Sequence, residues 1–444
     1  MTFWLSLKDI KKGSKRRIFA SELDRNLLEQ KVSVAGWVED VRPLGSLLFL
    51  TVRDVSGIVQ AVFRKSNTPR DVFTTAKILT RQSIVVIHGT VKESKAKHVK
   101  VEIQADSIEI VSPATHPLPI DPTGRVDSSL DLRLHARALD LRNPSTAAIF
   151  KIKHLVLQSI RKTLIDERFI EVNTPKIIGQ AVEGGATLFS LDYFGNEAFL
   201  AQSPQLYKEQ LTLSLERVFE ISTYFRAEKS HTRRHLNEFV SVDIESAFSC
   251  KDDVMNILEK IIVKAHEDVL KNCQNELNIL NRDLDIPRIP FNKITYFKAL
   301  EELHDSGLKI NFGDDLDTRA LRILGRKHEG FYFIIDWPTK LKPFYIEIDE
   351  LNDEISESFD LMYGHIELAS GGTRVSDKKK LEKRLLESGL DTKSFSDHLE
   401  AFSWGMPPHA GWGLGLDRFI MVFTGMENIR EAVLYPRDRF RLTP

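Results

Sequence analysis

The chain has 444 residues, of which 42% are hydrophobic and 28% charged, a composition typical of a soluble protein with two or three domains. It contains no apolar run long enough to span a membrane, and its opening "MTFWLSLKDIKKGSKRR" does not fit a secretory signal. Two cysteines without a CxxC spacing argue against a zinc site and indicate a reducing compartment, so we expect a cytoplasmic protein.

Charge is unevenly distributed along the chain. Residues 1–112 contain 19 Lys and Arg against 12 Asp and Glu, whereas the whole chain carries a net charge of −1, so the remainder is acidic. A basic front domain suggests a polyanionic partner such as nucleic acid. The alternative is a basic surface that contacts only solvent.

Residues 31–111 follow a β pattern. Segments rich in β-branched residues, separated by polar or glycine turns, predict strands at 31–38, 47–54, 57–63, 83–91 and 99–111, with one helical stretch at 70–80. This order predicts a five-stranded OB-fold β-barrel over residues 21–112, behind an N-terminal extension at 1–20. Such barrels bind single-stranded nucleic acid through a face with aromatic and cationic side chains.

The segment that follows is rich in proline and is predicted to be a hinge or linker over residues 113–140. A second domain then begins, at 141–444, with an amphipathic helix. Asn143 is a suitable N-cap, Pro144 suits the first helical position, and apolar residues recur at helical spacing from Ile149 to Leu164.

The rest of the second domain mixes strands and helices. Strands are predicted at 198–205, 217–228, 238–248 and 331–337, and helices at 252–270, 379–388 and 393–402. Successive strands without intervening helices disfavour a doubly wound parallel sheet. We therefore expect an α+β protein whose second domain is an antiparallel sheet flanked by helices.

The stretch "PPHAGWGLGLDRF" at 407–419 invites comparison with nucleotide motifs. Its glycines do not fit the dinucleotide spacing, since Leu416 stands where the third glycine belongs, and no P-loop lysine follows. What remains is a glycine-rich backbone that leads into a helix with Arg418 in its first turn. Such a backbone allows a ligand to approach closely, and the arginine could reach a phosphate. The alternative is a tight turn with a surface arginine.

Three further stretches carry clustered polar residues. In 224–248, Arg226 and Glu228 share one face of a strand, and a loop holding Arg234 and His235 follows. In 359–374, Asp360, Glu367 and Ser370 are hard oxygen ligands that suit Mg²⁺, with Arg374 following two glycines. In 200–210, Ser203, Gln205 and Lys208 end a strand and could bind a small anion. Taken alone, the three clusters have structural alternatives: a charge pair on an edge strand with a solvated loop, an acidic pair of the kind that is usually structural, and a capped helix N-terminus.

The order of these stretches carries a resemblance. "FIEVNTPKII" with Pro175, then "FRAE" followed by "EF", then "GLGLDR" resemble the three motifs of class II aminoacyl-tRNA synthetases, in sequence order. An OB barrel ahead of that core resembles the subclass for aspartate, asparagine and lysine. Within it, "QSPQLYK" and the ending "YPRDRFRLTP" resemble aspartyl-tRNA synthetases of the archaeal and eukaryotic type. Val182, before Glu183, departs from the Thr or Ser that is usual there.

The resemblance implies an activity and a set of roles. The chain would activate L-aspartate with ATP and Mg²⁺ to aspartyl-adenylate and transfer it to tRNA, with Arg226 and Arg418 as catalytic residues. Lys208 and Arg374 would hold the side-chain carboxylate of the substrate and so select aspartate over asparagine. The implied aspartate-binding residues are Glu183, Ser203, Gln205, Lys208, Arg226, Asp243, Ser370 and Arg374. The implied ATP-binding residues are Arg226, Glu228, Arg234, His235, Leu236, Phe239, Glu367, Gly413, Gly415, Leu416, Asp417 and Arg418. The implied metal ligands are Asp360, Glu367 and Ser370. In the barrel, Phe49, Gln60 and Glu102 would contact the anticodon.

The resemblance also implies a cytoplasmic homodimer, with Pro175 and the preceding helix at the interface, tRNA-Asp as partner, and no membrane. Whether tRNA-Asn is charged as well stays open, as does the role of the basic extension, which could bind tRNA or be a tail. Two alternatives remain: an asparaginyl-tRNA synthetase or asparagine-forming paralogue, against which Lys208 argues, and a non-catalytic tRNA-binding protein, against which Arg226, Glu367 and Arg418 argue.

Overall fold

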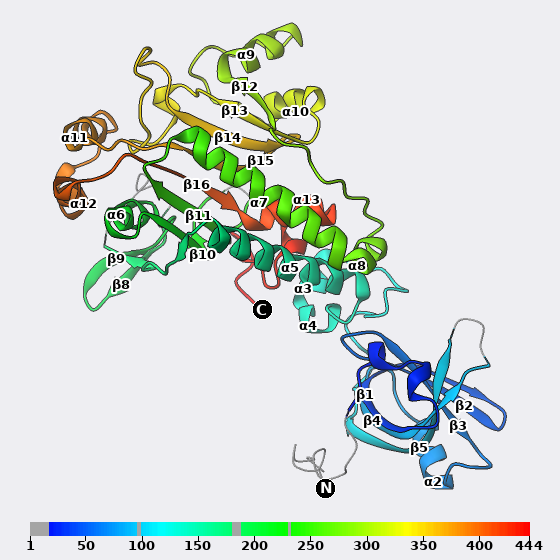
Figure 1. Cartoon of the computed structure of the whole chain (residues 1–444). Coiled ribbons are helices and arrows are strands. Elements are labelled where there is room, and N and C mark those ends of the chain that lie inside the picture. Colours follow the sequence, from blue (N-terminus) through cyan, green and yellow to red (C-terminus); the bar gives the residue numbers. More distant parts are fainter. Residues whose placement is uncertain (1–16, 96–98, 180–187, 230–231) are drawn as a thin grey trace. The chain divides into compact units, whose positions relative to one another are not determined.

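The computed structural model describes residues 17–95, 99–179, 188–229 and 232–444. The chain forms two compact units (Figure 1). The first comprises residues up to Leu132 together with Ala138–Arg142, and the second comprises Arg133–Arg137 and Asn143–Pro444. Within the described residues, no helix is long and apolar enough to cross a membrane.

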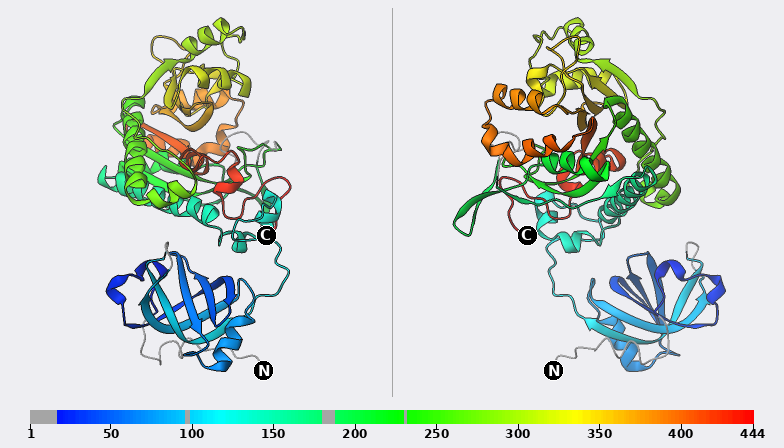
Figure 2. Two further views of the ribbon diagram at one scale, coloured as in Figure 1. Left: turned by 90° about the vertical axis from the view of Figure 1, so that its right-hand side faces the viewer. Right: turned by 60° about the vertical axis from the view of Figure 1, so that its left-hand side comes forward.

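The first unit is a closed five-stranded barrel with strand order β1-β2-β3-β5-β4. Its strands, which can be followed in Figure 2, are β1 (Lys31–Leu44), β2 (Leu47–Arg53), β3 (Ile58–Arg64), β4 (Ile84–Glu93) and β5 (Val101–Ser112). Alternate residues of each strand point inward, so that Leu48, Leu50, Ala61 and Ile103 fill the interior. The helix α2 (Arg70–Lys77) follows β3 and buries Phe73 against this core. The predicted OB-type barrel is confirmed, with a helix before the fourth strand.

The second unit is built on an eight-stranded sheet with order β12-β13-β14-β15-β16-β11-β10-β6. Its strands are β6 (Ile170–Glu171), β10 (Arg217–Phe225), β11 (Glu238–Ala247), β12 (Asn292–Thr295), β13 (Phe331–Ile335), β14 (Ser358–Tyr363), β15 (Ile366–Thr373) and β16 (His409–Gly415). The pairs from β13 to β10 are antiparallel, and only the two outermost pairs, β12 with β13 and β6 with β10, are parallel. The predicted antiparallel sheet is therefore confirmed.

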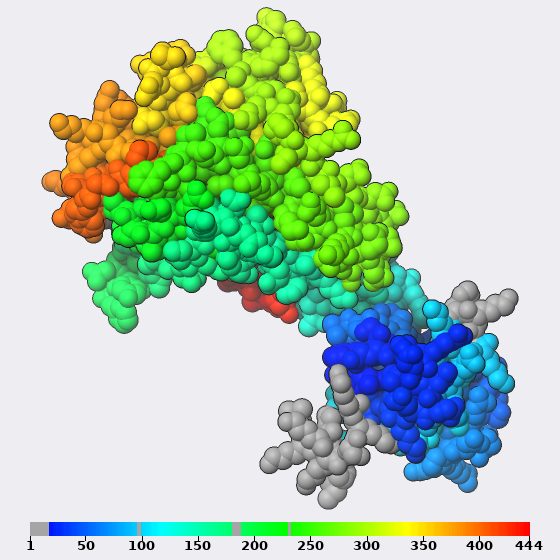
Figure 3. All heavy atoms as spheres, in the orientation of Figure 1, coloured from blue at the N-terminus to red at the C-terminus, as the bar shows by residue number. Residues whose placement is uncertain are grey.

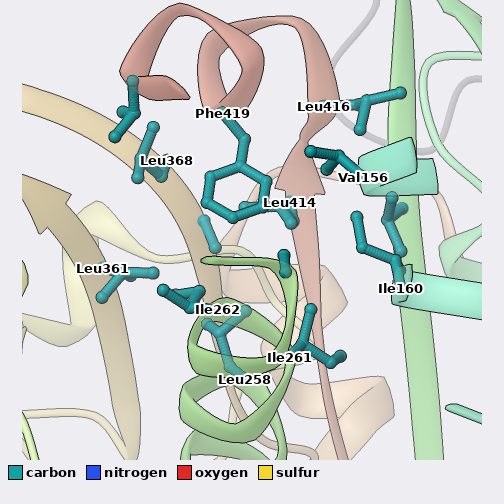
Figure 4. Close-up of a cluster of buried hydrophobic side chains, with 14 of the residues drawn as sticks. Val156, Ile160, Leu258, Ile261, Ile262, Leu361, Leu368, Leu414, Leu416 and Phe419 are labelled. Atoms are coloured by element: carbon teal, nitrogen blue, oxygen red, sulfur yellow. The ribbon is translucent and has the colours of Figure 1, made fainter. Parts of the chain in front are cut away.

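Two long helices lie side by side over one face of this sheet, α5 (Pro144–Asp166) and α7 (Lys251–Asn272), and they cover that face in the space-filling view (Figures 1 and 3). Asn143 caps α5 by accepting a hydrogen bond from Ser145 N, as its sequence predicts. Figure 4 shows how the apolar side chains of both helices meet those of the sheet and of α13 (Leu416–Thr424). This core includes Val156 and Ile160 from α5, Leu258 and Ile262 from α7, Leu361, Leu368 and Leu414 from the sheet, and Leu416 and Phe419 from α13.

The remaining elements surround the sheet. A small sheet of order β7-β9-β8 is formed by Ile177–Ile178, Asn196–Leu200 and Ser190–Tyr193. The other α-helices are α3 (Leu130–His135), α4 (Arg137–Asp140), α6 (Gln205–Leu215), α8 (Gln274–Ile279), α9 (Tyr296–Asp305), α10 (Thr318–Lys327), α11 (Lys378–Glu387) and α12 (Ser396–Ala401).

Several predicted elements differ in the structure. The strand predicted at 217–228 ends at Phe225, so Arg226 and Glu228 lie in the loop after β10 and do not share one face of a strand. The strand predicted at 198–205 ends at Leu200, because the segment that follows turns into α6, which starts at Gln205. The helix predicted at 393–402 is divided into a 3-10 turn (Thr392–Phe395), α12 and a second 3-10 turn (Phe402–Trp404), each with its own buried aromatic or apolar side chains.

Candidate functional site

A pocket of about 330 Å³ opens on the face of the large sheet away from α5 and α7, and its lining mixes residues of β11, β15, β16, α6 and the loop after β10. The register of the sheet explains its floor. Asp243 on β11 pairs with Gly413 on β16, Gly413 pairs with Ser370 on β15, and Ser370 pairs with Asp360 on β14. Directly opposite residues in a sheet point to the same side, so these four residues form one row across the floor.

The glycines of β16 occupy every second position, so they all lie on the same face of the strand. Trp412 and Leu414 alternate with them and are fully buried in the core, as is Leu416 at the start of α13. Gly411 and Gly413 therefore face the pocket side, where a Cβ on Gly411 would lie 2.3 Å from Glu245 Oε2 and one on Gly413 2.9 Å from Asp243 Oδ1. These glycines belong to a central strand of the sheet. Because they have no side chains, they leave room beside the strand for the carboxylates of Glu245 and Asp243 and for a ligand.

Two buried cations lie at one end of the pocket. Lys208 Nζ is 3.3 Å from Asp243 Oδ1 and 3.4 Å from Glu245 Oε2, and it also donates to the carbonyl of Trp412. Arg374 Nε lies 2.9 Å from Glu245 Oε1, and its Nη2 lies 3.3 Å from Oε2. Burial raises the pKa of the Asp243 carboxyl, and Lys208 opposes that effect. Four charged side chains thus hold one another in place where water is largely excluded.

All but one of the predicted amino-acid ligands line this same pocket. Its lining includes Ser203, Gln205, Lys208, Arg226, Asp243, Ser370 and Arg374. Glu183, which was predicted beside them, lies outside the described residues.

The opposite end of the pocket is rich in arginine. Arg418 Nη1 donates to the carbonyl of Glu367 at 3.0 Å, and the Arg226 guanidinium lies 5.4 Å from the centre of the Phe239 ring. The pKa of His235 is lowered by burial and by Arg418, so its neutral form is favoured. The pKa of Arg234 is likewise lowered, by burial and by Arg322 and Arg418. Like charges held this close favour a polyanionic ligand such as a triphosphate.

The predicted nucleotide ligands line the pocket in all but one case. The lining includes Arg226, Glu228, Arg234, His235, Leu236, Phe239, Glu367, Gly413, Gly415, Asp417 and Arg418. Leu416 is the exception, since its side chain is fully buried in the core (Figure 4). Asp417 has a structural position as well, because its carboxylate accepts hydrogen bonds from Lys153 Nζ at 2.6 Å and from Val240 N at 3.1 Å.

The residues predicted to bind a metal lie on β14 and β15. Glu367 and Ser370 line the pocket. Burial and the like charge of Asp360 raise the pKa of Glu367, and a divalent cation nearby would counteract both effects. Asp360, however, receives Lys342 Nζ on both oxygens, at 2.7 and 2.8 Å. Across the described residues, no three His, Cys, Asp or Glu side chains gather as a metal site. Glu367 and Ser370 are oxygen donors of the kind that suits Mg²⁺, whereas both oxygens of Asp360 already accept from Lys342.

Sequence reasoning missed two of the charged residues in this region. Glu245 anchors both Lys208 and Arg374, and Lys342 lines the pocket beside Asp360. Glu245 lies two residues after Asp243 on β11 and therefore on the same face, a signal that was present in the sequence. Lys342 gave no such signal, since it belongs to a loop between two strands.

The three residues predicted to contact an anticodon come together on the barrel. Thr51 pairs with Gln60 and Phe49 with Val62 across β2 and β3, so Phe49 and Gln60 share the face that points away from the barrel core. Gln60 Nε2 donates to Glu102 Oε2 on β5 at 3.0 Å. An aromatic ring, an amide and a carboxylate thus lie on one surface.

Comparisons with known proteins agree with this architecture. Residues 129–439 match the family model of class II tRNA synthetases (D, K and N), and residues 32–111 match the model of an OB-fold nucleic acid binding domain. The chain is 46% identical to the aspartate–tRNA(Asp/Asn) ligase of Archaeoglobus fulgidus, over 96% of this chain and 100% of the relative. It is 44% identical to the enzyme of the same name from Methanothermobacter thermautotrophicus, over 97% and 99%.

Solved structures of two specificities resemble the fold. Asparaginyl-tRNA synthetase from Pyrococcus horikoshii, complexed with asparaginyl-adenylate, has a TM-score of 0.92 at 33% identity and covers 97% of this chain and 100% of its own. Aspartyl-tRNA synthetase from Entamoeba histolytica has a TM-score of 0.87 at 32% identity, with 98% and 94% covered. Because both share the fold, the choice of amino acid depends on side chains in the pocket.

Proposed function

The chain belongs to the class II tRNA synthetases (D, K and N), and from this premise we propose that it is an ATP-dependent aspartate–tRNA ligase. The observation that carries the choice of aspartate is the buried pair of cations, Lys208 and Arg374, at one end of the pocket. Two fixed cations bind a side-chain carboxylate strongly, whereas the amide of asparagine gains little from them.

The reaction needs no nucleophilic side chain. The α-carboxylate of aspartate attacks the α-phosphate of ATP, and pyrophosphate leaves. Asp243, with Gln205, would bind the α-ammonium, and Arg226 would bridge the α-carboxylate and the α-phosphate. Arg418, Arg234 and His235 would hold the outer phosphates, and Phe239 would stack on adenine. The protein thereby positions two anions and offsets their charge.

We propose that Mg²⁺ is held by Glu367 and Ser370, with Asp360 beside them. The ion would neutralise phosphate oxygens when bound. The pocket-facing Glu367 supports this assignment, because burial and the like charge of Asp360 raise the pKa of its carboxyl, and a cation would favour the charged form.

The barrel would read the anticodon through the surface formed by Phe49, Gln60 and Glu102. In functional terms we divide the chain into an extension (1–20), an anticodon-binding domain (21–112), a hinge (113–140) and a catalytic domain (141–444). The relatives named for tRNA(Asp/Asn) support charging of tRNA-Asn as well as tRNA-Asp. We further propose a cytoplasmic homodimer that uses the region around Pro175, where the two-residue strand β6 forms one edge of the large sheet.

Amino-acid-dependent ATP–pyrophosphate exchange tests the amino-acid assignment. We expect exchange with aspartate and at least a hundredfold lower efficiency with asparagine, on the order of what a charged hydrogen bond contributes. Exchange with asparagine alone would make the chain an asparaginyl enzyme, and exchange with neither would favour a tRNA-binding protein without activity.

Aminoacylation of purified tRNA-Asp and tRNA-Asn with labelled aspartate tests the tRNA assignment. Charging of both is expected, and charging of tRNA-Asp alone would limit the proposal to that tRNA. Sedimentation of the purified protein tests the dimer, which a monomer at micromolar concentration would contradict.

A further inference from the structure

A buried carboxylate stands behind the amino-acid end of the pocket. Glu209, on α6, is fully inaccessible to solvent and does not line the pocket. Gln205, one helical turn earlier on α6, does line the pocket, and its Nε2 donates to Glu209 Oε1 at 2.5 Å. Isolated carboxylates are rarely buried, so this one requires an explanation.

Two histidines face the other oxygen of Glu209. His398 Nε2, from α12, lies 3.4 Å from Glu209 Oε2, and His409 Nε2, from the start of β16, lies 3.8 Å from the same atom. All three side chains are at least 97% buried. The cluster therefore joins three elements of the domain.

The hydrogen bonds at Nδ1 of the two imidazole rings indicate which ring nitrogens carry a proton. The Gln210 amide Nε2 lies 3.1 Å from His398 Nδ1 and can only donate to it, so the proton of a neutral His398 ring is on Nε2, facing Glu209. His409 Nδ1 lies 2.9 Å from the carbonyl of Pro407 and must donate to it. Burial lowers the pKa of His409, but the Glu209 carboxylate outweighs that effect and the pKa is raised, which favours the charged ring. Burial acts to raise the pKa of Glu209, yet the two histidines hold it below its ordinary value. Glu209 is thus an anion that accepts hydrogen bonds and cannot donate one.

An anion in this place fixes the direction of the Gln205 amide. The two ends of that amide have similar shapes and opposite hydrogen-bonding roles. Since Glu209 accepts only, it holds Nε2 and leaves Oε1 for the pocket. The reversed amide would present an N–H donor to the ammonium of a substrate, which also only donates.

We propose that Glu209 is a positioning residue for amino-acid binding: held by His398 and His409, it orients Gln205 so that the amide oxygen accepts a hydrogen bond from the α-ammonium of the substrate. This inference rests on the proposed function and extends it to a residue that does not touch the substrate. Its effect should fall on amino-acid binding and not on ATP binding.

A double-mutant cycle on the full-length protein tests the proposal by pyrophosphate exchange. Glu209→Gln keeps the shape but can hold the Gln205 amide in either direction, so the KM for aspartate should rise about tenfold, with kcat and the KM for ATP nearly unchanged. In a Gln205→Ala background, Glu209→Gln should cause no further rise. The matched control is Glu259→Gln, which alters a buried glutamate on α7 that accepts from Phe291 N and does not line the pocket.

An equal rise in both backgrounds, or an unchanged KM in the single variant, would overturn the inference. If Glu209→Gln does not fold, Glu209→Asp can replace it in the double-mutant cycle with Gln205→Ala. The shorter side chain keeps the charge but moves the carboxylate away from Gln205. Failure of the proposed function is distinguishable, since it appears in the wild type as absent aspartate exchange. If the wild type activates asparagine instead, the cycle applies unchanged with asparagine, whose α-ammonium is the same group.

Discussion

Arg374 and Lys208 meet at one buried carboxylate: Arg374 Nε lies 2.9 Å from Oε1 of Glu245 and its Nη2 lies 3.3 Å from Oε2, while Lys208 Nζ lies 3.4 Å from Oε2. The two cations that we assign to the substrate are therefore held in place before any substrate arrives. Their positions depend on a residue that has no direct role in the reaction.

Replacement of Glu245 by glutamine should lower both stability and aspartate binding. The change leaves Arg374 and Lys208 buried beside a neutral amide, and breaking a buried ion pair costs roughly 3 kcal/mol. Urea unfolding should report this loss, and the KM for aspartate should rise in parallel. Glu238→Gln, at the exposed start of the same strand, is the control and should alter neither quantity.

Lys208→Met should strongly reduce the use of aspartate while leaving the binding of ATP nearly unchanged. We expect kcat/KM for aspartate to fall about a hundredfold, since a buried charged hydrogen bond to the substrate is lost, with the KM for ATP nearly unchanged. Lys251→Met removes a partly buried lysine paired with Asp336 away from the pocket and serves as control. Equal aspartate kinetics in Lys208→Met would remove the basis of the specificity assignment.

Arg418→Ala should have the opposite pattern. The side chain lies at the arginine-rich end of the pocket, so the KM for ATP should rise about tenfold or more, and aspartate binding at the other end should change little. Initial rates at varied ATP concentration measure this effect. Arg326→Ala, at an exposed position of α10, is the matched control, and an unchanged KM for ATP in Arg418→Ala would contradict the assignment.

Phe49→Ala should separate the two activities of the enzyme. Loss of a base-stacking ring costs about 1–3 kcal/mol of nucleic-acid binding, so the KM for tRNA should rise while pyrophosphate exchange continues at the normal rate. Ile78→Ala, which removes a barrel side chain that is 72% exposed, is the control. Loss of exchange as well as charging would show that the barrel surface is not confined to tRNA recognition.

His266 predicts an acid-dependent loss of stability. It is buried between Phe331 and Phe423, and burial lowers its pKa to about 4. The unfolded chain binds a proton near pH 6.5 and the folded chain does not until about pH 4, so stability falls as the pH drops through this window, by about 3 kcal/mol in total. Unfolding free energies measured from pH 7 to pH 4 should decline less steeply in His266→Met. The difference in slope should correspond to nearly one proton fewer taken up on unfolding. Parallel slopes would contradict the prediction.

Much of the fold followed from local pattern. The capped helix after Asn143 and the five barrel strands were predictable, because capping residues and hydrophobic periodicity act over a few residues. The division of the helix near residue 396 was not, because tertiary packing of Phe395 and Phe402 decides it.

The sequence predicted which residues belong to the site better than it predicted the contacts between them. Resemblance to known motifs named residues that the structure gathers in one pocket, such as Arg226 and Arg374. No local rule indicates that Glu245 would pair with an arginine 129 positions later, or that Lys342 would occupy both oxygens of Asp360. Leu416 belongs to the core because alternation along β16 continues by one residue into α13.

The central place of β16 has a consequence for synthesis of the protein. It is the last strand to be translated, yet it lies between β11 and β15, both made earlier. Until His409–Gly415 has been synthesised, β11 and β15 each lack their partner strand, and unpaired strand edges favour aggregation. A chain truncated before this strand lacks the part of the pocket floor between Asp243 and Ser370. Premature termination should therefore yield an inactive chain that proteases degrade, and not a partially active enzyme.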